Sequence, residues 1–166
     1  MEPGEIIRLA GRSRELATSN KTAPEAFILA QVAWEGLRYR ILIVGHVAQG
    51  LSVADAKRQL DAQKPWNAAN YRAIFKELFG SEPSQSRIVG RTFRETDRTT
   101  DLRNRYVHGH SRTSPDIFLK HSRTLWTALE FDWEGALRDL LRDKTHLSGP
   151  SNPLGRLRKW KKSIEP

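Results

Sequence analysis

An arginine and a histidine five residues apart, Arg103 and His108, suggest the most specific chemistry in this sequence. The guanidinium of an arginine can meet two phosphate oxygens through parallel hydrogen bonds, and it stays charged at physiological pH. A histidine can gain and release protons near neutrality, as general acid–base catalysis requires. Together, these two residue types could bind a phosphodiester, stabilise charge on its oxygens and transfer a proton during its cleavage.

The segment that carries both residues, 84–108, is expected to be one amphipathic helix that ends at Gly109. At about 100° per residue, one face gathers arginines (Arg87, Arg91, Arg94, Arg98 and Arg105), and the opposite face gathers apolar and small residues (Ile88, Val89, Thr92, Phe93, Thr96, Thr100 and Val107). Arg103 lies in the middle of the apolar face if the helix is unbroken. An inward guanidinium is costly unless it is paired or lines a polar cleft, so Arg103 rather than Arg105 is the functional candidate.

The stretch from Arg103 to Gly109, Arg-Asn-Arg-Tyr-Val-His-Gly, resembles the signature of the HEPN superfamily (higher eukaryotes and prokaryotes nucleotide-binding). That signature is an arginine followed by a polar residue, with a histidine four to six residues after the arginine. The resemblance covers about residues 24–143. It implies a helical bundle that dimerises to bring two motifs together, and metal-independent endoribonuclease activity. It assigns catalytic roles to Arg103 and His108, with Asn104 as the supporting polar residue.

Metal-free cleavage of RNA by attack of the 2′-hydroxyl on the adjacent phosphorus needs a base, an acid and positive charge. One histidine is poorly suited to both proton transfers in the same step, and a two-fold dimer would supply a second His108 and a second Arg103. The candidate RNA-binding residues beside the catalytic ones are Arg94, Arg98, Arg105 and His110. The arginine face could follow an RNA backbone, although a solvated helix face explains it more simply.

The elements that must position these residues are predicted to be helices throughout. The expected fold is an all-α, up-and-down bundle of about five to six helices, which dimerises. Its domain spans residues 1–146, and residues 147–166 form a basic tail. The expected helices are 5–19, 24–48, 52–61, 67–79, 84–108 and one from 115 to shortly before Ser148.

The second of these helices carries a seam of apolar residues at alternating spacings of three and four: Phe27, Ala30, Trp34, Leu37, Ile41, Val44 and Ala48. We expect the dimer to bury this region. Glu35 lies beside the seam, where it could orient Arg103 across the bundle or pair with Arg38 in solvent; the solvent pair is the expected one. His46 is expected to be packed or to lie at an interface, His121 to lie on the surface, and Trp66, Trp126 and Trp133 to belong to the core.

Composition narrows the function classes. The formal net charge is +9 with a pI near 10.2, which favours a polyanionic partner such as RNA. Residues from Lys144 onward carry six basic side chains and one acidic, or +5, which leaves +4 on the rest. With no cysteine, no metal-binding motif and no glycine-rich phosphate loop, we expect no metal and no cofactor. No signal sequence or apolar run of membrane-spanning length is visible, so we expect a soluble, cytoplasmic protein.

Three functions fit these observations. The first is an endoribonuclease that cuts single-stranded RNA, as the effector of a toxin–antitoxin or phage-defence system with an antitoxin protein as a possible partner. The second is a non-catalytic RNA-binding or adaptor bundle. The third is a structural dimerisation module, which has little use for an inward arginine. The first two differ in whether the proton chemistry of His108 matters.

Overall fold

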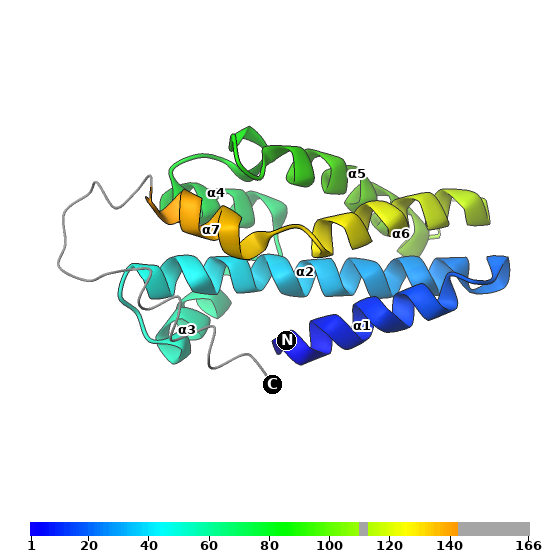
Figure 1. Cartoon of the computed structure of the whole chain (residues 1–166), viewed down its shortest axis with the longest axis horizontal. Helices are drawn as coiled ribbons and strands as arrows, with labels where there is room; N and C mark the ends of the chain where they lie inside the picture. The colour runs from blue at the N-terminus through cyan, green and yellow to red at the C-terminus, as the bar shows by residue number, and fades with distance from the viewer. Residues whose placement is uncertain (110–112, 143–166) are drawn as a thin grey trace. The chain divides into compact units, whose positions relative to one another are not determined.

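The computed structural model describes residues 1–109 and 113–142, and every regular element in these ranges is helical (Figure 1). The all-α prediction is therefore confirmed. The α-helices are α1 (Pro3–Leu16), α2 (Ala23–Ala48), α3 (Val53–Gln63), α4 (Ala68–Phe79), α5 (Gly90–Val107), α6 (Pro115–Leu129) and α7 (Trp133–Arg142). Two short 3-10 helices, η1 (Asn20–Thr22) and η2 (Pro83–Gln85), precede α2 and α5. None of the described helices is long and apolar enough to cross a bilayer.

The described residues form seven α-helices instead of the five to six expected, because the last expected helix is divided in two; the helix expected over 84–108 is also shortened. The segment expected over 84–108 first forms η2, and the Ser86 hydroxyl then accepts hydrogen bonds from two following backbone N–H groups, so α5 begins only at Gly90. The last expected helix ends at Leu129. A new one, α7, begins after Asp132, whose side chain accepts from the N–H of Gly135 at 3.0 Å.

The chain forms two compact units, and α2 contributes to both. The first unit contains residues 1–37 and 91–131, and therefore α1, the first part of α2, α5 and α6. Among the described residues, the second contains 38–90 and 132–142, with the rest of α2, α3, α4 and α7. The boundary expected between residues 146 and 147 lies outside the described residues.

In the first unit, α1 runs antiparallel to the beginning of α2. The Ser13 hydroxyl, near the end of α1, donates to the carbonyl of Ala26 at 2.6 Å. Ile6, near the beginning of α1, packs with Ala33, which lies later in α2. The indole N–H of Trp126 donates to the same hydroxyl at 3.0 Å and so joins α6 to α1. Together, these contacts fix the start of α2, on which α5 then packs.

Aromatic contacts set the direction of α5 against α2 within the same unit. Near its beginning, Phe93 contacts Trp34 at 5.5 Å between ring centroids. Near its end, Tyr106 contacts Phe118 of α6 at 4.9 Å, and Phe118 contacts Phe27 at 5.6 Å. Because the end of α5 lies near the beginning of α2, the two helices are antiparallel.

In the second unit, α2 is buried continuously from Arg40 to Val47. A Cβ atom at Gly45 would come within 2.8 Å of the Phe79 ring, so the glycine allows α4 to approach closely. Asn67 caps α4 by accepting from two backbone N–H groups. Trp66, just before this cap, is 71% exposed, so its prediction as a core residue is wrong.

The apolar seam of α2 is used inside the chain. Its members Phe27, Ala30, Trp34, Ile41 and Val44 are all buried in the single protomer. These side chains are already shielded from water, so the seam gives no physical reason for a second copy to cover this region. The physical argument for a dimer must come from another surface.

His46, expected to be packed, is buried, and its Nε2 atom has no hydrogen-bond partner within residues 1–109 and 113–142. Burial lowers its pKa from the usual 6.5, while the charge of Glu77 acts in the opposite direction. A depressed pKa in the folded state means that the unfolded chain takes up the proton first. The stability that depends on neutral His46 is therefore fully present above pH 6.5. The free energy of unfolding falls as the pH drops below that value, because the unfolded chain then binds the proton.

We predict that His46→Gln reduces this acid-induced loss. The free energy of unfolding, measured by urea denaturation at pH 8 and pH 5, should differ less between the two pH values in the variant than in the parent protein. Burial also lowers the pKa of His121, which acts in the same direction but is present in both proteins and cancels from the comparison. An equal loss in the variant would contradict the assignment.

Candidate functional site

Helix α5 is unbroken from Gly90 to Val107, so it carries Arg103 as the helical wheel required, and His108 follows its last residue directly. The N–H of His108 still bonds to the carbonyl of Asn104 at 3.1 Å, so helical geometry extends to the histidine. Gly109 then takes a left-handed conformation, with φ 72°, and its N–H bonds to the carbonyl of Tyr106 at 3.1 Å. Only glycine adopts this conformation without strain, so Gly109 ends the helix immediately after His108.

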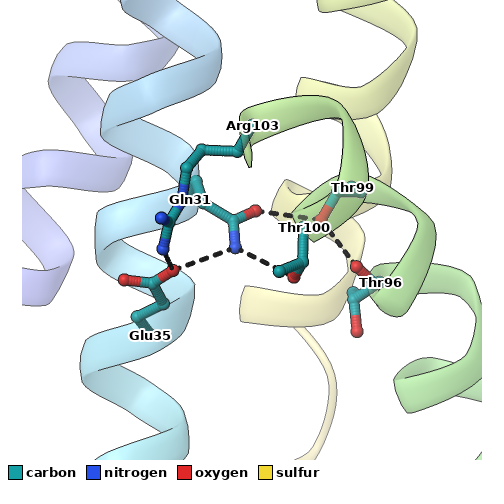
Figure 2. A network of polar contacts seen from close by, with 6 residues as sticks. All are labelled: Gln31, Glu35, Thr96, Thr99, Thr100 and Arg103. Carbon is teal, nitrogen blue, oxygen red and sulfur yellow. Dashed lines mark hydrogen bonds and ion pairs between the residues drawn. The ribbon is translucent and has the colours of Figure 1, made fainter. Parts of the chain in front are cut away.

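The side chain of Arg103 lies inward, whereas Asn104, Arg105 and His108 are exposed. Its Nη2 atom lies 2.5 Å from Oε1 of Glu35 on α2, and the two side chains are 33% and 41% exposed (Figure 2). The expected pairing of Glu35 with Arg38 is wrong. The Arg38 guanidinium lies instead over the ring of Tyr71, 4.0 Å from its centroid. The face of α5 predicted from the sequence thus places Arg103 correctly, and the structure identifies its partner.

A buried amide supports this ion pair. Gln31 is 1% exposed, and its Nε2 donates to Oε1 of Glu35 at 3.3 Å and to the Thr100 hydroxyl at 3.4 Å. Its Oε1 accepts from the Thr99 hydroxyl at 2.9 Å. The same hydroxyl lies 2.6 Å from the carbonyl oxygen of Thr96 (Figure 2). A polar side chain this deeply buried needs such partners. We call these six residues, Gln31, Glu35, Thr96, Thr99, Thr100 and Arg103, the Gln31 network.

The ion pair leaves most of the Arg103 guanidinium uncommitted. A guanidinium has five N–H donors, and within the described part of the chain one of them is used, by Glu35. The other four, on a side chain that is one-third exposed, can meet an anion. This arrangement suits recognition of a phosphate group by two parallel hydrogen bonds.

Aromatic side chains hold the end of α5 in place. Besides the contacts among Tyr106, Phe118 and Phe27, the ring of His121 on α6 lies edge-on to Phe27 at 6.3 Å. His121 is half-buried, so its prediction as a surface residue is wrong. Burial lowers its pKa, and the charges of Lys120 and Arg105 add to this effect. The contact through Tyr106 sets the position of the last turn, which carries His108.

The predicted RNA-binding arginines, Arg94, Arg98 and Arg105, are all exposed on α5. His110 lies outside the described residues. Val107, expected to face inward, is 60% exposed because Tyr106, one position earlier, makes the contact with α6. The last turn therefore presents Val107 and His108 to solvent together.

Sequence reasoning missed Gln31 and Thr99 as parts of the site. Gln31 lies on the buried face of α2 between Phe27 and Trp34, four residues before Glu35. A polar residue within an apolar face, one turn from a carboxylate, is the signal that could have revealed it. Thr99 gave no such signal because threonine is also common on helix faces that pack.

Among residues 1–109 and 113–142, no three His, Asp or Glu side chains gather closely enough to hold a metal ion. Comparison of the chain with protein-family models, with curated proteins and with solved structures finds no match. The functional interpretation therefore depends on the residues and their geometry.

We predict that Thr99→Val lowers the free energy of unfolding by about 1 kcal/mol, because it removes the buried hydroxyl that donates to Oε1 of Gln31 and leaves this oxygen without that donor. Thr127→Val is the matched control, since its exposed hydroxyl bonds within its own helix to the carbonyl of Arg123. Urea denaturation should show little change for the control. Equal effects would mean that the bond between α5 and α2 contributes nothing to stability.

Proposed function

We propose that this protein is a metal-independent endoribonuclease of the HEPN type, which cuts single-stranded RNA through the 2′-hydroxyl of the nucleotide preceding the cleaved bond. The observation that carries the proposal is the state of Arg103. It faces inward, is one-third exposed and is oriented by a carboxylate, and it keeps four donors for an anion. Five residues further on the same helix, His108 is exposed at the helix end.

In the proposed reaction, the guanidinium of Arg103 binds the non-bridging oxygens of the scissile phosphate. A base removes the proton from the 2′-oxygen, which forms a bond to phosphorus while the bond from phosphorus to the 5′-oxygen breaks. His108 takes part in proton transfer, and an acid protonates the leaving 5′-oxygen. The products are a 2′,3′-cyclic phosphate and a 5′-hydroxyl. Asn104 is the supporting polar residue beside Arg103.

RNA outside the cleaved bond would lie along the exposed arginines of α5: Arg94, Arg98 and Arg105. Their charge adds electrostatic affinity that does not depend on sequence. The basic tail from residue 147, which lies outside the described residues, would add to this affinity. A biological role as the effector of a toxin–antitoxin or phage-defence system, with an antitoxin protein as partner, follows from the family resemblance.

A homodimer would provide the second proton-transfer group. The exposed apolar side chains next to His108 are Tyr106 and Val107, and Ile117 is exposed in the first turn of α6, beside the Phe118 that contacts Tyr106. Two-fold association through this surface would shield these side chains from water and bring two copies of His108 together. This surface replaces the seam of α2 as the proposed interface.

We predict that His108→Ala and Arg103→Ala each abolish RNA cleavage, while Arg105→Ala has a mild effect because its side chain is exposed and does not face inward as Arg103 does. Cleavage of a labelled single-stranded RNA should persist in EDTA and yield 2′,3′-cyclic phosphate ends. Circular dichroism should show unchanged helicity in all three variants.

Retention of parental activity by His108→Ala would contradict the catalytic assignment. If the parent protein binds RNA without cutting it, the non-catalytic binding function is correct instead. Activity that is lost on chelation and restored by Mg²⁺ would indicate a different class of nuclease.

We predict that Val107→Glu produces a monomer and abolishes cleavage, because it places a charge in the proposed interface. Ile7→Glu is the matched control, since Ile7 on α1 is 71% exposed, and its replacement should change neither mass nor activity. Sedimentation at micromolar concentration measures the mass.

A mixture of Arg103→Ala and His108→Ala proteins should regain activity if each protomer supplies one of the two residues. A monomeric parent protein with full activity would refute the shared site.

A further inference from the structure

We infer that Glu35 and Gln31 are positioning residues, which hold the guanidinium of Arg103 in one orientation so that its remaining donors meet the scissile phosphate. That the ligand is a scissile phosphate rests on the proposed function, whereas the orientation of Arg103 by Glu35 and Gln31 does not. The inference adds two residues on α2 to a site whose other members lie on α5.

Arginine needs such support because its side chain is long and flexible. Ordering a free arginine costs rotamer entropy, and this cost would add to the barrier of the reaction. The ion pair with Glu35 fixes the guanidinium before substrate binds. Donors that are fixed in advance stabilise developing charge more effectively than donors that must first reorganise.

Glu35 alone would be a weak anchor. Its side chain is 41% exposed, and ion pairs of such exposure typically contribute little to stability. The amide of Gln31 contacts the same carboxylate oxygen that pairs with Arg103. Since Gln31 is buried, this second bond favours the rotamer of Glu35 that faces Arg103.

Gln31 is in turn held by α5, the helix that carries Arg103. Thr99 donates to its carbonyl oxygen and Thr100 accepts from its amide nitrogen. The contacts therefore form a closed circuit that leaves α5 through Arg103, passes along α2 through Glu35 and Gln31, and returns to α5 (Figure 2). Movement of the guanidinium away from Glu35 would disturb a buried part of this circuit.

The geometry favours orientation of Arg103 over its blockade. Glu35 engages one donor of five, and its second carboxylate oxygen points away from the guanidinium (Figure 2). If substrate had to displace Glu35 from Arg103, the hydrogen bond from buried Gln31 to Glu35 would oppose substrate binding. Arg14 and Glu130 form a comparable pair between α1 and α6 at 2.5 Å, but both side chains are more exposed, at 44% and 66%. That pair supplies a matched control.

The first measurement follows the orientation of Arg103 without reference to activity. The side-chain N–H signals of Arg103 in an NMR spectrum, assigned from their loss in Arg103→Ala, should be distinct and protected from exchange with water in the parent protein. Glu35→Gln should move them toward those of a free arginine. Gln31→Met, which fills a similar volume without an amide, should do so partially. Glu130→Gln should leave them unchanged.

The second measurement is RNA cleavage by the same variants. Glu35→Gln should lower kcat by about 10- to 100-fold, as expected when a catalytic group is displaced by about 1 Å, and should change KM by less than about 3-fold, a split that marks loss of an interaction made in the transition state. Gln31→Met should have a smaller effect of the same kind. Glu130→Gln should cut RNA at the parental rate.

Unchanged Arg103 signals in Glu35→Gln, or a higher rate of cleavage by that variant, would overturn the inference; the second result would show that Glu35 restrains Arg103 from substrate. A parent protein that does not cut RNA, but in which Glu35→Gln releases Arg103, would refute the proposed ribonuclease and leave the positioning role intact. The two hypotheses thus fail on different measurements.

Discussion

The site depends on one constraint: a guanidinium that faces the interior of a helical bundle must find a carboxylate and hydrogen-bond acceptors there. Arg103 meets this requirement through Glu35, and Glu35 is held by Gln31. A charge that is withdrawn from water is costly when it is unpaired, and Arg103 and Glu35, at 33% and 41% exposed, are partly withdrawn. The partial burial of the Arg103 guanidinium, which is unfavourable without a partner, also makes this group suitable for binding a phosphate.

Three kinds of packing maintain this arrangement in the first unit. Aromatic contacts fix the two ends of α5, the Gln31 network joins its middle to α2, and Ser13 and Trp126 join α1 to α6. Directionless apolar contacts supply most of the burial, and the polar contacts select one arrangement among those that burial alone would allow. The helix end at Gly109 then leaves His108 on the surface, next to the exposed Val107.

Local signals in the sequence predicted the helices well, because prolines, capping residues and apolar periodicity act over a few residues. They also placed Arg103 on the inward face. They did not reveal the break at Asp132, where an aspartate cap outweighs a periodicity that continues through it. Glu35 was assigned the wrong partner, since the nearest cation in sequence was Arg38 and the true one lies 68 residues away. The seam of α2 indicated burial correctly, but periodicity cannot tell whether the covering surface belongs to the same chain or to another.

The threonines of α5 also have a consequence for how precisely two helices can be aligned. Aromatic rings in contact can slide over one another with a gradual loss of energy, so the packing of Phe93 and Tyr106 tolerates small shifts of α5 along α2. Hydrogen bonds between the amide of Gln31 and two hydroxyls, Thr99 as donor and Thr100 as acceptor, tolerate much smaller shifts. A slip by one helical turn, about 5.4 Å, would carry Arg103 out of reach of Glu35 and strand a buried glutamine. The hydrogen bonds of Gln31 therefore select one axial alignment of α5 and α2 from several that would bury similar apolar area.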